Sequence, residues 1–466
     1  MSAYTDFLST KDPVVSPVGP AANRADVHPI LHDWQAEIVR WACERGRAAI
    51  FADCGLGKTF MQLEWARLVA AKTLIVAPLS VARQTAREAT KIGMNVRYVR
   101  DGNDVTGDGV WITNYELIER FDATEFGAVV LDESSILKNV EGKIRQRLTE
   151  SFSTVPYRLA CTATPAPNDV AELCNHSEFL GAMPRNEMLA AFFVHDEIGW
   201  RIKNHAIGPM HKWMAQWAVA LRSPADLGWP GETYVLPPLT VTAETVAVDI
   251  DADGQLFPTE LGGVGGRMAV RRATADARVE RAIEIMSDGN QWIAWCGLNN
   301  EAESIAKGVE GAVNVQGSMS PESKAEALEA FQDGAIRVLV TKPSIAGFGM
   351  NFQQASRMVF VGMSDSYEAY YQAIRRCYRF GQTEPVDVRI VVSDLERQIV
   401  DNVARKEHEA SITTTELIRY SSITKDKASD NTIDSPRQIQ PAHTSPALHN
   451  GRRSRRMLAS TTRRLV

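Results

Sequence analysis

The segment ADCGLGKT combines two glycines, a lysine and a threonine in the spacing of a phosphate-binding loop. It follows the apolar run AAIF and precedes a helical pattern, which is the position where such a loop can bind phosphate. Gly55, Leu56 and Gly57 would bring backbone N–H groups and the start of the helix against the phosphates. Lys58 would neutralise the β and γ charges, and Thr59 would give its hydroxyl to magnesium. A short motif of this kind also occurs by chance, so a second motif is needed.

Two adjacent carboxylates, Asp132 and Glu133, end the apolar run AVVL in the segment LDESSILKN. We expect Asp132 to hold a magnesium ion, largely through water, and Glu133 to polarise the water that attacks the terminal phosphate. An acidic pair at a strand end also caps helices in unrelated proteins. The order of the two motifs and the roughly 75 residues between Lys58 and this pair favour a shared nucleotide site.

A third segment, QAIRRCYRFGQ, begins at Gln372 and contains Arg376 and Arg379. The pattern predicts that these arginines, three residues apart, share one face of a helix. Two guanidinium groups that point the same way could stabilise the charge that develops on a γ-phosphate, an effect worth roughly 10³ to 10⁵ in rate. The alternative is a solvated basic face paired with acids, and only the other motifs favour the phosphate.

The elements that position these segments follow a βα rhythm. Residues 47–164 alternate short apolar runs with amphipathic stretches, and a second such series begins at residue 291, which predicts an α/β fold with two parallel-sheet lobes in tandem. Between the lobes we expect a helical insertion, whose many aromatic side chains would belong to the core more often than to a DNA-stacking surface. The predicted division is an N-terminal extension at 1–24, a first lobe at 25–175, the insertion at 176–234, a second lobe at 235–420 and a tail at 421–466.

The composition excludes several classes of protein. Of the 466 residues, 44% are hydrophobic and 23% are charged, which is close to the average for soluble globular proteins. We expect a cytoplasmic protein with no membrane contact, because the sequence has neither a long apolar run nor a signal-peptide pattern at its start. The six cysteines are scattered, which favours a reducing compartment and no structural metal. The formal charge of −6 permits nucleic-acid binding only through a local basic groove.

The tail differs from the rest of the chain in composition. From residue 421 onwards Ser, Thr, Asp, Asn, Pro and Gln prevail, so we expect a disordered C-terminal tail. Its last stretch, GRRSRRMLASTTRRLV, carries six arginines and no acid. These arginines would either add non-specific affinity for phosphates or be solvated without a function. The sequence leaves both interpretations open.

Seven segments together resemble, in order and spacing, the motifs of superfamily 2 helicases. They are ADCGLGKT, TLIVAPLS, ITNYEL, LDESSILKN, ACTATPAPN, VLVTKPSIAGFGMNFQ and QAIRRCYRFGQ. Three features are similar to the Swi2/Snf2-like DNA translocases: Lys138 and Asn139 after the acidic pair, the TATPAPN segment, and the RCYRFGQ segment. The resemblance implies two RecA-like lobes, with ATP and Mg²⁺ as the cofactors.

The resemblance also implies roles for individual residues. Gln35 would bind the adenine edge, Thr162 and Thr164 would relay the state of the γ-phosphate to the DNA side, and Gln372 would share in this coupling. Gly347 and Gly349 would approach the nucleotide. The residues expected to touch the DNA backbone are Pro78, Ser80, Thr113, Asn114, Tyr115, Thr341, Lys342 and Ser344.

Two departures from the family pattern affect these expectations. Ser134 and Ser135 follow the acidic pair where many relatives have alanine and histidine, so the coupling of the nucleotide to the TATPAPN segment would be looser or differently wired. Pro343, Ser344 and Ile345 replace residues that are usually small, which affects the expected DNA contacts in that motif.

The resemblance implies a DNA-dependent ATPase that moves on duplex DNA without sequence preference, in a compact bacterial or phage form. A protein partner in replication, recombination or restriction is possible. Three alternatives stay open: a strand-separating or branch-migrating helicase, a motor subunit that works only within a nuclease or modification complex, and a nucleotide-dependent scaffold that does not translocate.

Overall fold

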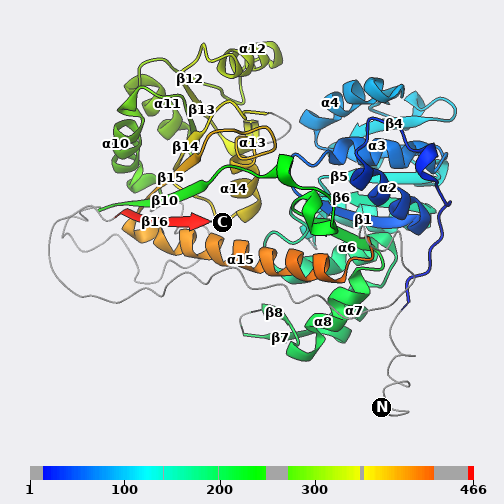
Figure 1. Ribbon diagram of the computed structural model, residues 1–466. Coiled ribbons are helices and arrows are strands. Elements are labelled where there is room, and N and C mark those ends of the chain that lie inside the picture. Colours follow the sequence, from blue (N-terminus) through cyan, green and yellow to red (C-terminus); the bar gives the residue numbers. More distant parts are fainter. Residues whose placement is uncertain are drawn as a thin grey trace. The chain divides into compact units, whose positions relative to one another are not determined.

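The computed structural model describes residues 14–139, 141–197, 199–247, 271–346, 351–423 and 460–465. The described chain forms two compact units, which we treat one at a time (Figure 1). The first unit contains the residues up to Val235 together with those from Arg405 to the end of the last helix, and the second contains Leu236–Ala404 and the C-terminal strand. The boundary at Val235 lies next to the predicted start of the second lobe.

The first unit is built on a seven-stranded sheet in which all paired strands are parallel. Its order is β3-β4-β2-β5-β6-β1-β9. The strands are β1 (Arg47–Ala52), β2 (Thr73–Ala77), β3 (Val96–Tyr98), β4 (Val110–Asn114), β5 (Ala128–Asp132), β6 (Tyr157–Cys161) and β9 (Ala218–Leu221). Successive side chains of a strand point to opposite faces. Ala49 and Phe51 therefore enter one apolar core and Ile50 enters another, so the sheet is covered on both faces.

Helices supply that cover, as parallel strands require. In the first unit they are α2 (Asp33–Arg45), α3 (Lys58–Leu68), α4 (Leu79–Ala89), α5 (Lys143–Ser151), α6 (Leu173–Leu180), α7 (Arg185–Phe192) and α8 (Ile207–Met214). Among the described residues, no helix is both long and apolar enough to cross a membrane.

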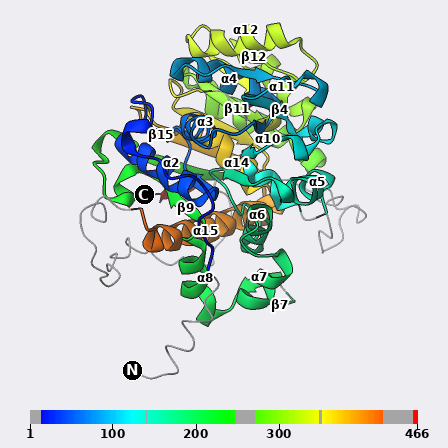
Figure 2. The ribbon, with the colours of Figure 1, turned by 90° about the vertical axis from the view of Figure 1, so that its right-hand side faces the viewer.

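The segment 176–234 contains the expected helices but also strands that the sequence analysis did not predict. β7 (Phe193–Asp196) and β8 (Gly199–Ile202) form an antiparallel hairpin, which projects with α7 and α8 from the α6 side of the first unit (Figures 1 and 2). β9 pairs with β1 and so belongs to the sheet of the first unit. The interpretation of the aromatic residues as core is confirmed for Trp213 and Trp217, which are buried and lie 5.6 Å apart between ring centroids.

The second unit has a sheet of the same kind, with order β12-β13-β11-β14-β15-β10-β16. Its strands are β10 (Leu239–Val246), β11 (Trp292–Cys296), β12 (Ala312–Asn314), β13 (Val338–Thr341), β14 (Arg357–Val361), β15 (Val386–Ser393) and β16 (Ser460–Leu465). Its helices are α10 (Ala275–Ile285), α11 (Asn299–Gly308), α12 (Pro321–Gln332), α13 (Pro343–Ala346), α14 (Tyr367–Ile374) and the first part of α15 (Arg397–Tyr420). The predicted fold class, two parallel-sheet α/β lobes in tandem, is confirmed.

The tail pairs with the second unit at one place. β16 runs antiparallel to β10, with Leu465 opposite Leu239, whereas the other paired strands of this sheet are parallel. The sequence analysis did not predict this strand. Residues 424–459, on which most of the predicted disorder falls, lie outside the described residues.

Helix α15 is shared by the two units. Up to Ala404 it belongs to the second unit, where Val403 is buried, and from Arg405 it belongs to the first. There Leu417 is 1% exposed within an apolar core of the first unit. Arg222, at the end of β9, donates to the Ser411 carbonyl at 2.7 Å and to the Thr415 hydroxyl at 2.8 Å. The sequence division at residue 420 missed this, because the amphipathic pattern of a helix does not reveal which core its apolar face joins.

We predict that Leu417→Ala lowers the free energy of unfolding by about 2–5 kcal/mol, because it leaves a cavity in a filled core. Chemical denaturation followed by tryptophan fluorescence measures this change. Ile412 lies on the same helix but is 47% exposed, so Ile412→Ala serves as the control and should change stability by no more than about 0.5 kcal/mol. Equal losses in the two variants would show that the C-terminal half of α15 does not contribute to the core of the first unit.

Candidate nucleotide site

Strand register brings the predicted nucleotide-binding segments to one edge of the first sheet. β6 lies between β5 and β1, and Cys161 at its end is opposite both Asp132 and Ile50. The phosphate-binding loop follows β1, the acidic pair ends β5, and the TATPAPN segment follows β6. Since the carboxyl ends of parallel strands lie at a common edge, three segments that are distant in sequence become neighbours.

The loop after β1 has the backbone of a phosphate cradle. Gly57 adopts a left-handed conformation with φ 74° and ψ 32°, which glycine adopts without strain. A Cβ atom at this position would lie 2.4 Å from Nε2 of Gln35. The left-handed backbone therefore favours glycine at position 57, and a larger residue would also displace the Gln35 side chain.

Polar groups in the loop fit a bound triphosphate. The Lys58 ammonium donates to the carbonyls of Ala52, at 2.7 Å, and Asp53, at 3.2 Å, so it lies where β1 ends and the loop begins. The backbone N–H groups from Gly55 to Thr59 have no hydrogen-bond acceptor within the part of the chain that the structure describes. They surround the N-terminus of α3, where N–H groups and the helix dipole favour anions. Phosphate oxygens would supply the missing acceptors.

Gln35 braces this loop from α2. Its Nε2 donates to the Leu56 carbonyl at 3.0 Å, and its Oε1 accepts from the His32 backbone N–H at 2.9 Å. Trp34 beside it is buried, with its ring edge-on to Tyr234 at 5.8 Å. The structure thus gives Gln35 a role in holding the loop, and adenine binding by Gln35 stays a prediction.

In the acidic pair, Asp132 is buried and Glu133 has a strained backbone. Asp132 is 5% exposed, and burial raises the pKa of its carboxyl, while the nearby Gln62 amide and the Lys58 charge act in the opposite direction. A divalent cation at this carboxylate would favour the ionised form in the same way as Lys58 does. Glu133 has φ 54° and ψ 56°, a left-handed conformation that costs a non-glycine residue on the order of 1–3 kcal/mol. Such strain is typical of functional positions.

The TATPAPN segment contacts the acidic pair directly. The Thr162 hydroxyl donates to Oε2 of Glu133 at 3.4 Å, and the Thr164 N–H donates to the Thr162 hydroxyl at 3.1 Å. Both threonines are buried. The two residues predicted to relay the nucleotide state are therefore joined to each other and to the predicted water-activating carboxylate.

A histidine outside the predicted motifs completes this cluster. Nε2 of His176, on α6, lies 3.1 Å from the Ser134 hydroxyl, and both side chains are fully buried. The ring also meets Phe51 of β1 edge-on at 5.3 Å. Burial lowers the pKa of His176 to about 4, so the ring is neutral at physiological pH. Ser134, which departs from the family pattern, indicated that the contacts after the acidic pair differ from those of relatives. The sequence analysis assigned His176 to the insertion and so did not connect it with Ser134.

In the second unit, the structure corrects the prediction for the two arginines. Arg376 and Arg379 do not lie on a helix face, because α14 ends at Ile374 and turns follow it. In a continuing helix the carbonyls of residues 376 and 377 would accept bonds from residues further along. Here the Arg376 carbonyl accepts from the Phe352 N–H at 2.9 Å, and the Cys377 carbonyl accepts from the Gln382 side chain at 3.3 Å. The bond from Phe352 is a tertiary contact and the bond from Gln382 is local, and both use carbonyls that a continuing helix would use itself.

The structure describes Gln372 but not the two glycines that were predicted to approach the nucleotide. Gln372 is buried on α14, 4% exposed. Gly347 and Gly349 lie outside the described residues. The described residues contain no cluster of three or more His, Cys, Asp or Glu side chains arranged to hold a metal ion.

Two family models match the chain, in the order of the two units. Residues 28–193 match the SNF2-related domain, and residues 277–381 match the helicase conserved C-terminal domain. The chain is a Snf2-like member of helicase superfamily 2. Its domains are those of ATP-hydrolysing enzymes, which agrees with the phosphate cradle and acidic pair of the first unit.

The sequence identity to individual relatives is low. The chain is 23% identical over 414 residues to the SWI/SNF-related matrix-associated actin-dependent regulator of chromatin subfamily A-like protein 1 of Xenopus laevis, and 22% identical to that of Xenopus tropicalis. Each alignment covers 78% of this chain but 42% of the relative, so the chain spans about two fifths of their length. The solved Sulfolobus solfataricus SWI2/SNF2 ATPase core in complex with dsDNA shares 18% identity, with a TM-score of 0.42, covering 87% of this chain and 99% of that one.

The residues predicted to touch DNA divide into buried and accessible ones. The Tyr115 hydroxyl donates to the Asp132 carbonyl at 2.7 Å, and the Thr341 hydroxyl donates to the Val315 carbonyl at 3.1 Å. These side chains hold other parts of the fold, and the prediction that they contact DNA finds no support there. Thr113 and Asn114 are also buried. The accessible members of the predicted set are Pro78, Ser80, Lys342 and Ser344, which are half-buried or exposed.

We predict that acid destabilises the first unit partly through His176. Its folded-state pKa, about 4, lies below the ordinary value of 6.5, so the unfolded chain binds the proton first and stability is lost as the pH falls from about 6.5 towards 4. The loss attributable to this group should approach about 3 kcal/mol. Denaturation curves at several pH values should show a flatter dependence for His176→Gln, whereas above pH 7 the difference between variant and wild type should be constant. A parallel dependence in the two proteins would mean that the ring is accessible to protons in the folded state.

Proposed function

We propose that the chain is a DNA-dependent ATPase motor that couples ATP hydrolysis to movement along duplex DNA. The observation that carries the proposal is the contact of Thr162 with Glu133, at the sheet edge that also holds the Lys58 loop. It joins the predicted hydrolytic carboxylate to the segment that, in the family pattern, reports the nucleotide state. The whole activity remains a proposal because the chain covers less than half of its curated relatives.

The proposed chemistry of hydrolysis uses the side chains of the first unit. Lys58 would exchange its bonds to the Ala52 and Asp53 carbonyls for bonds to the β- and γ-phosphates. Asp132 and Thr59 would hold Mg²⁺, which neutralises phosphate charge when bound. Glu133 would orient the attacking water and draw off its proton. Its strained backbone is consistent with a side chain held in one direction for that task.

The second unit would contribute Arg376 and Arg379 to stabilise the γ-phosphate, as the family pattern implies. Both side chains are half-buried and follow the end of α14. The two arginines lie in turns instead of on a helix. The backbone of Arg376 is fixed there by the hydrogen bond from the Phe352 N–H to the Arg376 carbonyl. Adenine binding by Gln35 and nucleotide contacts from Gly347 and Gly349 belong to the same proposal.

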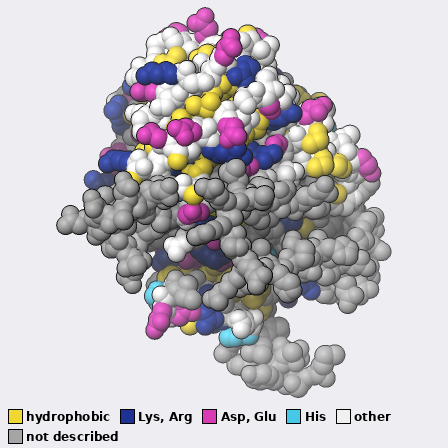
Figure 3. Space-filling model, turned by 90° about the vertical axis from the view of Figure 1, so that its left-hand side faces the viewer, with side chains coloured by type: hydrophobic (Ala, Val, Ile, Leu, Met, Phe, Trp, Pro, Cys, Tyr) yellow, Lys and Arg dark blue, Asp and Glu magenta, His cyan; other side chains and the backbone are white. Residues whose placement is uncertain are grey.

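Duplex DNA is the proposed track. The choice follows from the resemblance to the Swi2/Snf2-like DNA translocases, and the expected contacts are with the backbone, hence independent of sequence and sensitive to salt. On the described parts of the face shown in Figure 3, basic and acidic side chains are interspersed, so we do not assign the DNA path to that surface. Ser80, Lys342 and Ser344 are the accessible candidates for phosphate contacts.

Hydrolysis should depend on Lys58 and Glu133. We predict that Glu133→Gln lowers kcat by roughly 10²- to 10⁴-fold, since the amide cannot take the proton of water. Lys58→Ala should abolish measurable turnover by weakening the phosphate contacts. The assay is steady-state ATP hydrolysis with magnesium and duplex DNA, with Glu119→Gln, an exposed glutamate of the same unit, as the control. Near wild-type hydrolysis by folded Glu133→Gln protein would refute the assignment.

The response to nucleic acid separates the proposed motor from its alternatives. We predict that duplex DNA stimulates hydrolysis more than single-stranded DNA or RNA does, and that the protein displaces a third strand from a triplex while a forked duplex stays paired. Raising salt from 50 to 200 mM should weaken DNA binding by orders of magnitude. Stimulation by single strands alone would indicate an unwinding helicase. No stimulation would indicate a partner-dependent subunit or a scaffold.

A further inference from the structure

The five residues that follow the acidic pair are held by α6. Ser134–Lys138 form a 3-10 helix that begins directly after Glu133. The Ser134 hydroxyl is hydrogen-bonded to His176, and the Leu137 carbonyl accepts from the Asn175 side chain at 2.8 Å. Two consecutive residues of α6 therefore fix the beginning and the end of this short helix.

The same α6 is tied to the TATPAPN segment. Asn168, the last residue of that segment, donates from its backbone N–H and its side-chain amide to Glu172, at 3.1 and 3.0 Å. Glu172 is the N-cap residue of α6. The acidic pair and the TATPAPN segment are thus joined twice: directly, through Thr162 and Glu133, and indirectly, through α6 and Ser134.

The bond at Ser134 bears on the direction of the Glu133 side chain. Glu133 has a left-handed backbone that a glutamate does not adopt without support from its surroundings. The neighbouring residue Ser134 is fully buried and bonded to a ring that is itself fully buried and packed on Phe51. In this dry setting a lost partner leaves a polar group unsatisfied, so the pair resists rearrangement.

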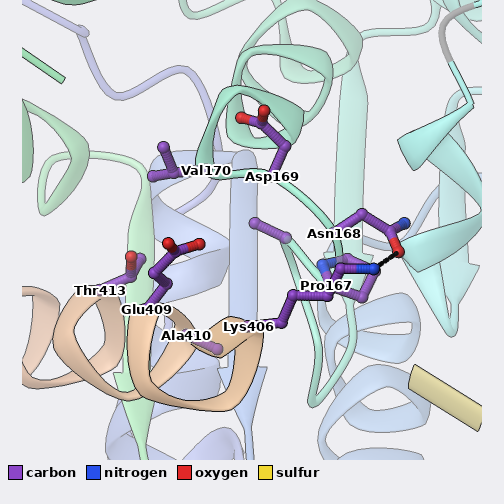
Figure 4. Close-up of a pocket in the computed structure, with 9 residues that line it drawn as sticks. Pro167, Asn168, Asp169, Val170, Lys406, Glu409, Ala410 and Thr413 are labelled. Atoms are coloured by element: carbon purple, nitrogen blue, oxygen red, sulfur yellow. Dashed lines mark hydrogen bonds between the residues drawn. The ribbon is translucent and has the colours of Figure 1, made fainter. Parts of the chain in front are cut away.

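We infer that His176 is a positioning residue, which through its hydrogen bond to Ser134 holds Glu133 in the direction needed for hydrolysis and links it through α6 to the TATPAPN segment. The inference rests on the proposed function, because it assigns a role within the proposed hydrolytic site. Of the two expectations for this coupling, looser or differently wired, the inference favours the second and names the residues that provide it. The network also reaches the surface, where Lys406 of α15 donates to the Asn168 side chain at 3.3 Å (Figure 4).

The test compares two buried histidines of the first unit. His211 on α8 is 1% exposed and His176 is fully buried, but the His211 ring is bonded locally to the Ile207 carbonyl at 2.7 Å. We expect His176→Phe to lower kcat for ATP about tenfold or more with KM for ATP within about twofold, and to reduce the stimulation by duplex DNA. His211→Phe should leave kcat and stimulation unchanged even where it lowers the melting temperature by a similar amount.

Two further variants separate positioning from packing. Ser134→Ala removes the partner with little change in volume and should reproduce the loss of kcat, and the double variant with His176→Phe should be no worse than either single variant. His176→Gln retains a side-chain amide that can bond Ser134, and it should recover most of the lost activity. Equal losses in the His176 and His211 variants, additive losses in the double variant, or no effect of Ser134→Ala would each overturn the inference.

Amide hydrogen exchange supplies a readout that does not depend on hydrolysis. Exchange in the segment 133–138 should be faster in His176→Phe and Ser134→Ala than in the wild type, and unchanged in His211→Phe. If the wild-type protein fails to hydrolyse ATP, the proposed function fails, yet unchanged exchange in this segment would still overturn the inference. If the wild type is an active DNA-dependent ATPase and the His176 variants match it, the inference alone is wrong.

Discussion

The register of three adjacent parallel strands determines where the candidate nucleotide site lies. β5, β6 and β1 end at one edge, with Cys161 opposite both Asp132 and Ile50. A shift of one residue in this register would turn alternate side chains to the other face. It would end the alignment of Asp132 with Cys161 and so displace the carboxylate relative to the Lys58 loop. The two apolar cores that alternate along β1 fix this register, so the chemistry at the edge depends on packing in the interior.

Contiguous motifs made part of this site predictable. The Lys58 loop and the Asp132–Glu133 pair each have their residue types, flanking apolar run and turn signal within a few positions, so sequence alone indicated both. Contacts between distant residues were not predictable. His176 lies 42 residues from Ser134, and only the packing of α6 brings the two together. Tyr115 was expected to touch the DNA backbone, and its bond to the Asp132 carbonyl could not be read from the sequence.

The same limit explains the differences in secondary structure. The two lobes follow from the βα rhythm, which is a local property. The end of α14 before Arg376 is accompanied by hydrogen bonds from Phe352, which lies outside the segment, and from the Gln382 side chain within it, and a helical pattern reveals neither bond. β9 is a strand because an open edge beside β1 accepts it, and its four residues carry too short a pattern to stand out among the neighbouring tryptophans.

The path of α15 affects how the chain can be synthesised and folded. Residues Leu236–Ala404 of the second unit lie between two pieces of the first, so the first unit is discontinuous along the chain. During translation its core lacks Leu417 until almost the entire second unit has left the ribosome. The first unit therefore stays incomplete, without Leu417 in its core, during that interval. The second unit has its parallel strands in one uninterrupted stretch and can assemble its core in that interval.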